Sequence, residues 1–226
     1  MARKQTQTPD LIAALRALGE ILASQGEHAA VVVVGGTALI MQGLVTRVTR
    51  DVDVIAISHD PPERKRKVIE APEPLPDILT RAIARVARDY NLPDDWMNTT
   101  VGLQWKSGLP EGFEERIHWK QYNGLWVGLA DRYDLIFFKL YAAADSEGPT
   151  SVHFQDLMAL QPNNEELDAA AQWVRTQDPS APFAQILDEV LKYAKRNEYH
   201  RHPSPGGNCY RGDLDSMEGS WVVHRY

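Results

Sequence analysis

Two aspartates, Asp51 and Asp53, are separated by a single residue in the apolar run DVDVI. In a β-strand, residues two apart share one face, so both carboxylates would project together while the valines enter the core. Their Cα atoms would lie about 7 Å apart, which lets both carboxylates converge on one or two ions. Mg²⁺ is commonly held by one or two carboxylates, with phosphate oxygens completing its shell. We therefore predict that Asp51 and Asp53 bind Mg²⁺ (or Mn²⁺).

A diglycine precedes these aspartates and follows the apolar run of residues 30–34. Glycine adopts backbone conformations barred to other residues and lets a bulky anion come close to the chain. A helix that begins at this point directs its free N–H groups toward that anion, and Thr37 adds a hydroxyl in the first turn. We predict that Gly35, Gly36 and Thr37 hold the phosphates of a nucleotide.

Each of these two patterns is common by itself. A diglycine after a strand is usually a tight turn, and an Asp-x-Asp triplet is usually a solvated strand end. Their order, with a short helix between them and apolar residues around both, favours one shared site over two unrelated turns. The lysine of a P-loop does not follow the glycines, and the third glycine of a dinucleotide-binding loop is missing.

The elements that would position these residues follow from apolar periodicity and turn residues. A first helix, capped by Thr8 or Asp10, runs to about Ser24, and a hairpin turns at Asn123-Gly124. We expect strands at 30–34 and 51–57, a hairpin at 116–129, and helices at 37–43, 78–90, 131–144, 152–160, 164–176 and 183–195.

This order of elements predicts an α+β fold with a small mixed β-sheet and a helical C-terminal half. We expect an α/β core over residues 1–130, a helical region over 131–198 and an irregular tail over 199–226. Residues 59–76 read as a loop with the charged run ERKRK, which is either solvated or a mobile basic arm beside a polyanionic substrate.

Composition narrows the class of protein. The net charge of −7 argues against a broad electrostatic grip on nucleic acid. The single cysteine, Cys209, excludes an internal disulfide and a thiolate zinc cluster. Neither an export signal nor the roughly 20 apolar residues of a membrane helix is present, so we expect a cytoplasmic protein with no membrane partner.

The segment of residues 31–57 resembles the nucleotidyltransferase superfamily, whose pattern is an apolar residue, Gly, Gly or Ser, a short helix, and then Asp-x-Asp or Asp-x-Glu. The run RVTRDVD at residues 47–53 is similar to the Arg-x-Thr-x-Asp-x-Asp of the bacterial branch that includes the AbiEii-type toxins. The likeness is specific over residues 31–57, diffuse to about residue 170, and absent from the tail.

The resemblance implies further site residues. It places Lys139 against the triphosphate, and it has Asp156 help to complete the site. The alternatives are a surface lysine whose stem lies on apolar residues and an aspartate that caps a helix. Arg47 either binds phosphate as a fork or pairs structurally with Asp51 or Asp53.

The resemblance also implies an activity: magnesium-dependent transfer of a nucleoside monophosphate from a nucleoside triphosphate to a hydroxyl of RNA or of a protein. It further implies a toxin of a toxin–antitoxin or phage-defence module, with a cognate antitoxin as partner. The rival interpretation is a catalytically silent protein of this fold that binds nucleotide, RNA or a partner protein.

One feature of the superfamily has no evident counterpart here. Many members carry a third strand carboxylate as general base. In this sequence Glu114, Glu115 and Asp131 flank the expected hairpin, but none lies clearly inside a strand. Catalysis would then be slow, rely on Asp156, or be lost.

Overall fold

The computed structural model describes residues 10–58, 68–146 and 148–201. The charged run ERKRK and the tail beyond residue 201 lie outside the described residues. The elements are α1 (Leu11–Ser24), β1 (Ala29–Val34), α2 (Gly35–Met41), β2 (Val52–Ser58), α3 (Asp77–Tyr90), β3 (Met97–Asn98), β4 (His118–Tyr122), β5 (Leu125–Leu129), α4 (Arg132–Asp145), α5 (Val152–Ala159), α6 (Asn164–Gln177) and α7 (Ala181–Arg201). Short 3₁₀ helices span Thr100–Lys106, Glu114–Arg116 and Gly148–Thr150.

The sheet is mixed and has the strand order β3-β2-β1-β5-β4. β1 runs antiparallel to β2 and parallel to β5, while β3 runs parallel to β2 and β4 antiparallel to β5. The C-terminal end of β1 therefore lies beside the N-terminal end of β2, where Val34 is opposite Asp53. The predicted α+β fold with a small mixed sheet is confirmed.

Local sequence explains where the elements begin and end. The Asp10 carboxylate accepts hydrogen bonds from the backbone N–H groups of Ile12 and Ala13, so Asp10 caps α1, and Thr8 lies outside the described residues. α3 ends at Asn91, whose left-handed conformation closes the helix. The predicted hairpin turns at Asn123, which has a positive φ of 50°, and Gly124 follows it.

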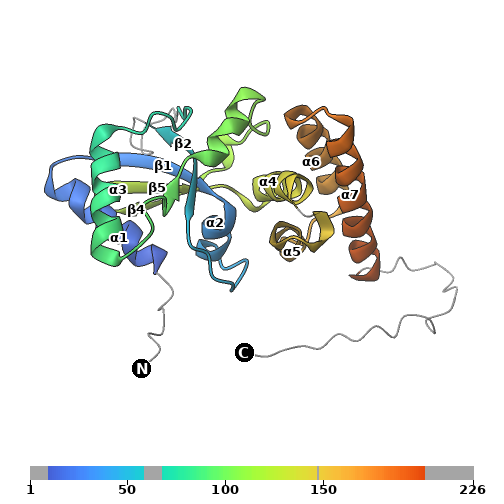
Figure 1. Cartoon of the computed structure of the whole chain (residues 1–226), viewed down its shortest axis with the longest axis horizontal. Helices are drawn as coiled ribbons and strands as arrows, with labels where there is room; N and C mark the ends of the chain where they lie inside the picture. The colour runs from blue at the N-terminus through green and yellow to red at the C-terminus, as the bar shows by residue number, and fades with distance from the viewer. Residues whose placement is uncertain (1–9, 59–67, 147, 202–226) are drawn as a thin grey trace, which may run out of the picture.

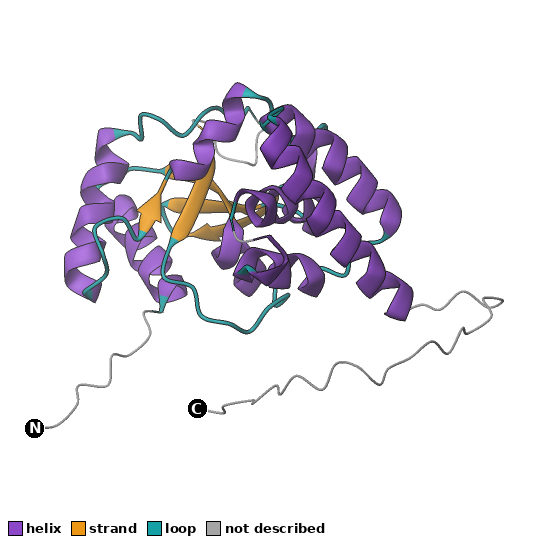
Figure 2. Ribbon diagram, turned by 45° about the vertical axis from the view of Figure 1, so that its right-hand side comes forward, coloured by secondary structure: helices purple, strands orange, loops and turns teal. Residues whose placement is uncertain are grey.

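Helices surround the sheet on both sides (Figure 2). Figure 1 shows α1 and α3 gathered on one side of the sheet, and α4, α5, α6 and α7 gathered on the other. α1 packs against α3 and β5, whereas α4 packs against α5, α6 and α7. Among the described residues, no helix is both long and apolar enough to cross a bilayer.

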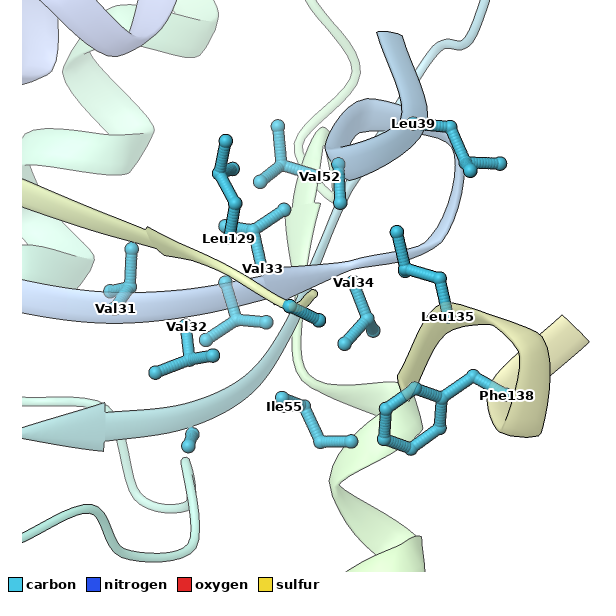
Figure 3. Packing of buried hydrophobic residues seen from close by; sticks show 14 of the residues in the cluster. Val31, Val32, Val33, Val34, Leu39, Val52, Ile55, Leu129, Leu135 and Phe138 are labelled. Carbon is cyan, nitrogen blue, oxygen red and sulfur yellow. The ribbon is translucent and has the colours of Figure 1, made fainter. Parts of the chain in front are cut away.

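One hydrophobic core joins the sheet to the C-terminal helices. β1 is apolar throughout and buried from Ala30 to Val34, as expected for a strand covered on both faces. Leu135 and Phe138 of α4 extend toward the end of β1 in Figure 3, and both are buried in the same core. This packing holds α4 next to the C-terminal end of β1.

The structure also contains elements that periodicity does not predict. The strand β3 consists of two residues, and a 3₁₀ helix at Thr100–Lys106 follows it. α7 begins at Ala181 and continues to Arg201, so it is longer than the predicted helix at 183–195.

Candidate functional site

The two aspartates lie beside the diglycine at the end of the sheet where β1 ends and β2 begins. Asp51 directly precedes β2, and Asp53 is its second residue. Both side chains are half-buried. The Thr37 hydroxyl, in the first turn of α2, donates a 2.6 Å hydrogen bond to the backbone carbonyl of Asp51. The structure therefore brings Asp51, Asp53 and the glycine corner (Gly35 and Gly36) together.

The glycines make room for side chains of this constellation. Gly35 has a φ of +69°, and a Cβ atom there would lie 2.1 Å from Oδ2 of Asp53. A Cβ atom on Gly36 would lie 2.8 Å from the Thr49 hydroxyl and 2.9 Å from Nη2 of Arg47. The positive φ of Gly35 favours glycine, and a larger residue at position 36 would displace the side chains of Thr49 and Arg47. The anion that comes closest to Gly35 is the carboxylate of Asp53.

Neutral side chains hold the two carboxylates. The Thr49 hydroxyl donates to Oδ1 of Asp51 over 3.0 Å, and Nδ2 of Asn98 donates to Oδ1 of Asp53 over 3.3 Å. Within residues 10–58, 68–146 and 148–201, neither carboxylate forms an ion pair with a lysine, arginine or histidine. Burial, and next the charge of Asp51, raise the pKa of Asp53 above its usual range. The acid pair thus retains charge that a cation would stabilise.

A separate carboxylate, Asp156, is saturated by two cations. Arg47 donates to it as a fork, with Nε 2.8 Å from Oδ1 and Nη2 2.6 Å from Oδ2, and Nζ of Lys139 lies 2.8 Å from Oδ2. Asp156 is 2% exposed and Lys139 is 3% exposed. Burial acts to raise the pKa of Asp156, but the hydrogen bonds from Arg47 and Lys139 outweigh it, so this pKa lies below its usual range.

These positions exclude the structural alternatives that the sequence analysis named for Lys139, Asp156 and Arg47. Lys139 is buried and paired, so it is not a surface lysine. Asp156 lies within α5, whose cap is Ser151, so it is not a capping residue. Arg47 forms its structural pair with Asp156 rather than with Asp51 or Asp53.

The cluster of Asp156, Arg47 and Lys139 (the Asp156 cluster) lies close to the acid pair, Asp51 and Asp53. α4, which carries Lys139, packs against both α2 and α5, and these three helices adjoin one another in Figure 1. Nη2 of Arg47 would lie 2.9 Å from a Cβ atom on Gly36, and the positive charges of Lys139 and Arg47 act to lower the pKa of Asp53, against the larger rise from burial and Asp51. The site therefore places two cations and two uncompensated carboxylates together, an arrangement suited to a metal ion and phosphate groups.

His153 is a neighbour of this cluster that the sequence analysis did not select. Burial and the positive charge of Lys139 lower its pKa, which favours the neutral imidazole. Its buried Nδ1 has no hydrogen-bond partner among the described residues. The only sequence signal for this residue is its spacing from Asp156, three positions away on α5, which puts both on one face.

No third carboxylate lies in a described strand. β1, β3, β4 and β5 contain no Asp or Glu. Of the candidates near the hairpin, Glu114 and Glu115 are exposed, and Asp131 caps α4 and pairs with His118 at 2.9 Å. β5 and β4 lie on the side of β1 that faces away from β2.

The donor set suits a hard divalent ion. Two carboxylate side chains are enough to hold Mg²⁺ or Mn²⁺ when nucleotide phosphates supply further oxygens. Among the described residues, no group of three or more His, Cys, Asp or Glu side chains could hold a metal by itself. The residues present therefore fit one divalent ion on two carboxylates, whose remaining coordination positions nucleotide phosphates would fill.

Comparison with known proteins identifies the family. Residues 10–159, about two thirds of the chain, match a family model described as a nucleotidyltransferase of unknown function (DUF6036). The matched region contains the diglycine, the acid pair and the Asp156 cluster, and it ends where α5 ends. No curated protein and no solved structure matches the chain. The chain belongs to this family of nucleotidyltransferases, DUF6036.

Proposed function

We propose that this protein is a magnesium-dependent nucleotidyltransferase, which moves a nucleoside monophosphate from a nucleoside triphosphate to a hydroxyl of RNA or of a protein. One observation carries the proposal: Asp51 and Asp53 are held only by neutral donors among the described residues, although two cations lie nearby. A purely structural acid pair in this place would be expected to take Arg47 or Lys139 as its partner. Family membership supports the same conclusion.

In this proposal the acceptor oxygen attacks the α-phosphate, the bond to pyrophosphate breaks, and the acceptor proton leaves to solvent. A bound Mg²⁺ would align the phosphates and offset the charge that develops on the leaving pyrophosphate. Asp51 and Asp53 would hold it. Arg47 and Lys139 would attract the triphosphate, and Asp156 would keep their side chains in place.

The glycine corner would place the triphosphate beside the side chains that lie against it. Gly36 is buried, and the side chains of Asp53, Thr49 and Arg47 occupy the space that a Cβ atom on Gly35 or Gly36 would need. The Thr37 hydroxyl hydrogen is used by the carbonyl of Asp51, so Thr37 would contribute mainly by fixing Asp51. Asp156 would not act as general base, because the hydrogen bonds from its two cations lower its pKa and so make it a weak base.

The test is transfer of labelled nucleoside monophosphate. Wild-type protein would be incubated with each α-labelled triphosphate, Mg²⁺ and total RNA, and also without RNA to detect protein acceptors. Asp51→Asn and Asp53→Asn would each lower transfer by about 10³-fold, since losing several kcal/mol of metal stabilisation costs a factor of ten for each 1.4 kcal/mol. Asp89→Asn removes one exposed charge on α3 and serves as the matched control.

The outcome also separates an enzyme from a silent binding protein. If folded wild-type protein transfers no label with any triphosphate but still binds Mg²⁺-nucleotide, the protein is a binding module of this fold. If Asp51→Asn transfers label as well as wild type does, the acid pair is not the catalytic metal site.

We further propose the role implied by the resemblance, that of a toxin controlled by a cognate antitoxin. Induced expression of the wild-type chain in a bacterial host would then arrest growth, whereas Asp51→Asn would not. Equal growth of both strains at equal protein levels would contradict this role and leave the transfer activity to be judged by the labelling assay.

A further inference from the structure

The strand next to β2 places an amide against the acid pair. β3 runs parallel to β2, and Asn98 lies in register with Asp53. In parallel strands, residues in register project their side chains to the same face. Nδ2 of Asn98 is 3.3 Å from Oδ1 of Asp53. The first side chain beside Asp53 on this edge is therefore a neutral hydrogen-bond donor.

The orientation of this amide is fixed by the backbone. The N–H group of Thr100 donates a 3.1 Å hydrogen bond to Oδ1 of Asn98. Because that oxygen is occupied, the NH₂ group is the end of the amide that faces Asp53. The other oxygen of Asp53, Oδ2, lies against Gly35. The Asp53 carboxylate is thus confined on two sides, by Asn98 and by the glycine.

A carboxylate confined in this way keeps its full charge. A lysine or arginine at position 98 would confine Asp53 equally well but would neutralise it, and the attraction for a metal ion would fall. An acid at this position would instead add a third negative charge about 3 Å from Asp53, a separation at which like charges repel strongly. The amide avoids both effects.

We propose that Asn98 is a positioning residue for the metal site: it orients Asp53 and limits the site to two carboxylates, so that the nucleotide-free protein binds a single divalent ion. This inference rests on the proposed function. The charge of two carboxylates matches one divalent cation, whereas a third carboxylate would favour a second ion, as in two-metal sites.

Mn²⁺ binding without nucleotide tests the proposal, with free Mn²⁺ counted by electron paramagnetic resonance. Wild type would bind one ion. Asn98→Ala would still bind one ion, but about tenfold more weakly, the effect expected for losing a hydrogen bond to a charged group. Asn98→Asp would bind two ions. Its melting temperature would be lower than that of wild type without metal and would rise more on adding Mn²⁺.

Thr99→Ala provides the matched control. Thr99 is the next residue, and its hydroxyl donates to Glu73 instead of to the acid pair. This variant also loses one side-chain hydrogen bond, but its Mn²⁺ affinity would equal that of wild type. A merely structural role for Asn98 would make both variants alike: the melting temperature would fall and Mn²⁺ affinity would not change.

The outcomes distinguish this inference from the proposed function. If Asp53→Asn abolishes Mn²⁺ binding while Asn98→Ala binds as wild type does, Asn98 is not a positioning residue and the metal site stands. An Asn98→Asp protein that binds only one ion also overturns the inference. If wild type itself binds no Mn²⁺ even with nucleotide, or Asp53→Asn binds it as wild type does, the proposed metal site fails as well.

Discussion

The acid pair and Asp156 are two groups of carboxylates in one site, and the fold treats them differently. Asp51 and Asp53 accept hydrogen bonds from the neutral side chains of Thr49 and Asn98. Asp156 is almost fully buried and takes hydrogen bonds from two cations. The partner of an acid, and not the acid itself, therefore determines whether that acid is available to a metal ion.

The direction of the pKa shift records the same difference. Burial raises the pKa of Asp53, with a further contribution from its acidic neighbour, because no described cation is bonded to it. Burial acts on Asp156 in the same direction, but its two bonded cations reverse the effect. The ionised form of Asp156 therefore stabilises the fold, whereas the ionised form of Asp53 costs stability until a cation arrives.

The largest effect that this comparison predicts is loss of stability in Asp156→Ala. Removing the carboxylate leaves Arg47 and the buried Lys139 without a counter-charge, and breaking a buried ion pair in this way costs about 3–5 kcal/mol. The melting temperature would fall by roughly 10 °C. Thermal unfolding followed by circular dichroism at pH 7 measures it.

The control is Asp168→Ala, which removes an exposed aspartate that is paired with Lys195 on the surface. A surface pair contributes about 1 kcal/mol or less, so this variant would melt close to wild type. Equal losses for Asp156→Ala and Asp168→Ala would mean that the buried cluster does not hold the site together.

Only part of this arrangement could be predicted from the sequence. Hydrophobic periodicity located both central strands, the hairpin and the main helices, because each buries a face with a regular repeat. The acid pair followed from its alternation at the start of β2, which Asp51 precedes by one residue. β3 has two residues and hence no period, so Asn98 was missed.

The partner of Asp156 depends on tertiary packing. Arg47 and Asp156 are far apart in the sequence and meet only because α5 packs on α4, and α4 on α2. Spacing along the chain carries no information on that contact. The same holds for the glycines: their need for φ > 0 or for space could be inferred, but the side chains that fill that space, Asp53 and Arg47, could not.

A second, smaller effect has the opposite sign. Asp53→Asn removes one charge of the repelling acid pair and keeps the size of the side chain, so the metal-free protein would become more stable. We expect the melting temperature in EDTA to rise by roughly 2–4 °C, the change that about 1 kcal/mol gives in a domain of this size. A fall in melting temperature would show that the Asp53 charge has a structural partner.

The smallest effect is the pH dependence of the difference in melting temperature between Asp53→Asn and wild type. The folded-state pKa of Asp53 is raised, so its ionisation costs no stability below the ordinary aspartate pKa of about 3.9 and its full cost above the raised value. As the pH falls through this window, Asp53 becomes neutral and wild type comes to resemble Asp53→Asn. The gain in melting temperature of Asp53→Asn over wild type, measured in EDTA, would therefore shrink on acidification. Asp156 stays ionised through the same window in both proteins because its pKa is lowered, so its contribution cancels in the difference.

A gap that stays constant down to pH 4 would contradict the raised pKa, and with it the view that Asp53 stands without a bonded cation.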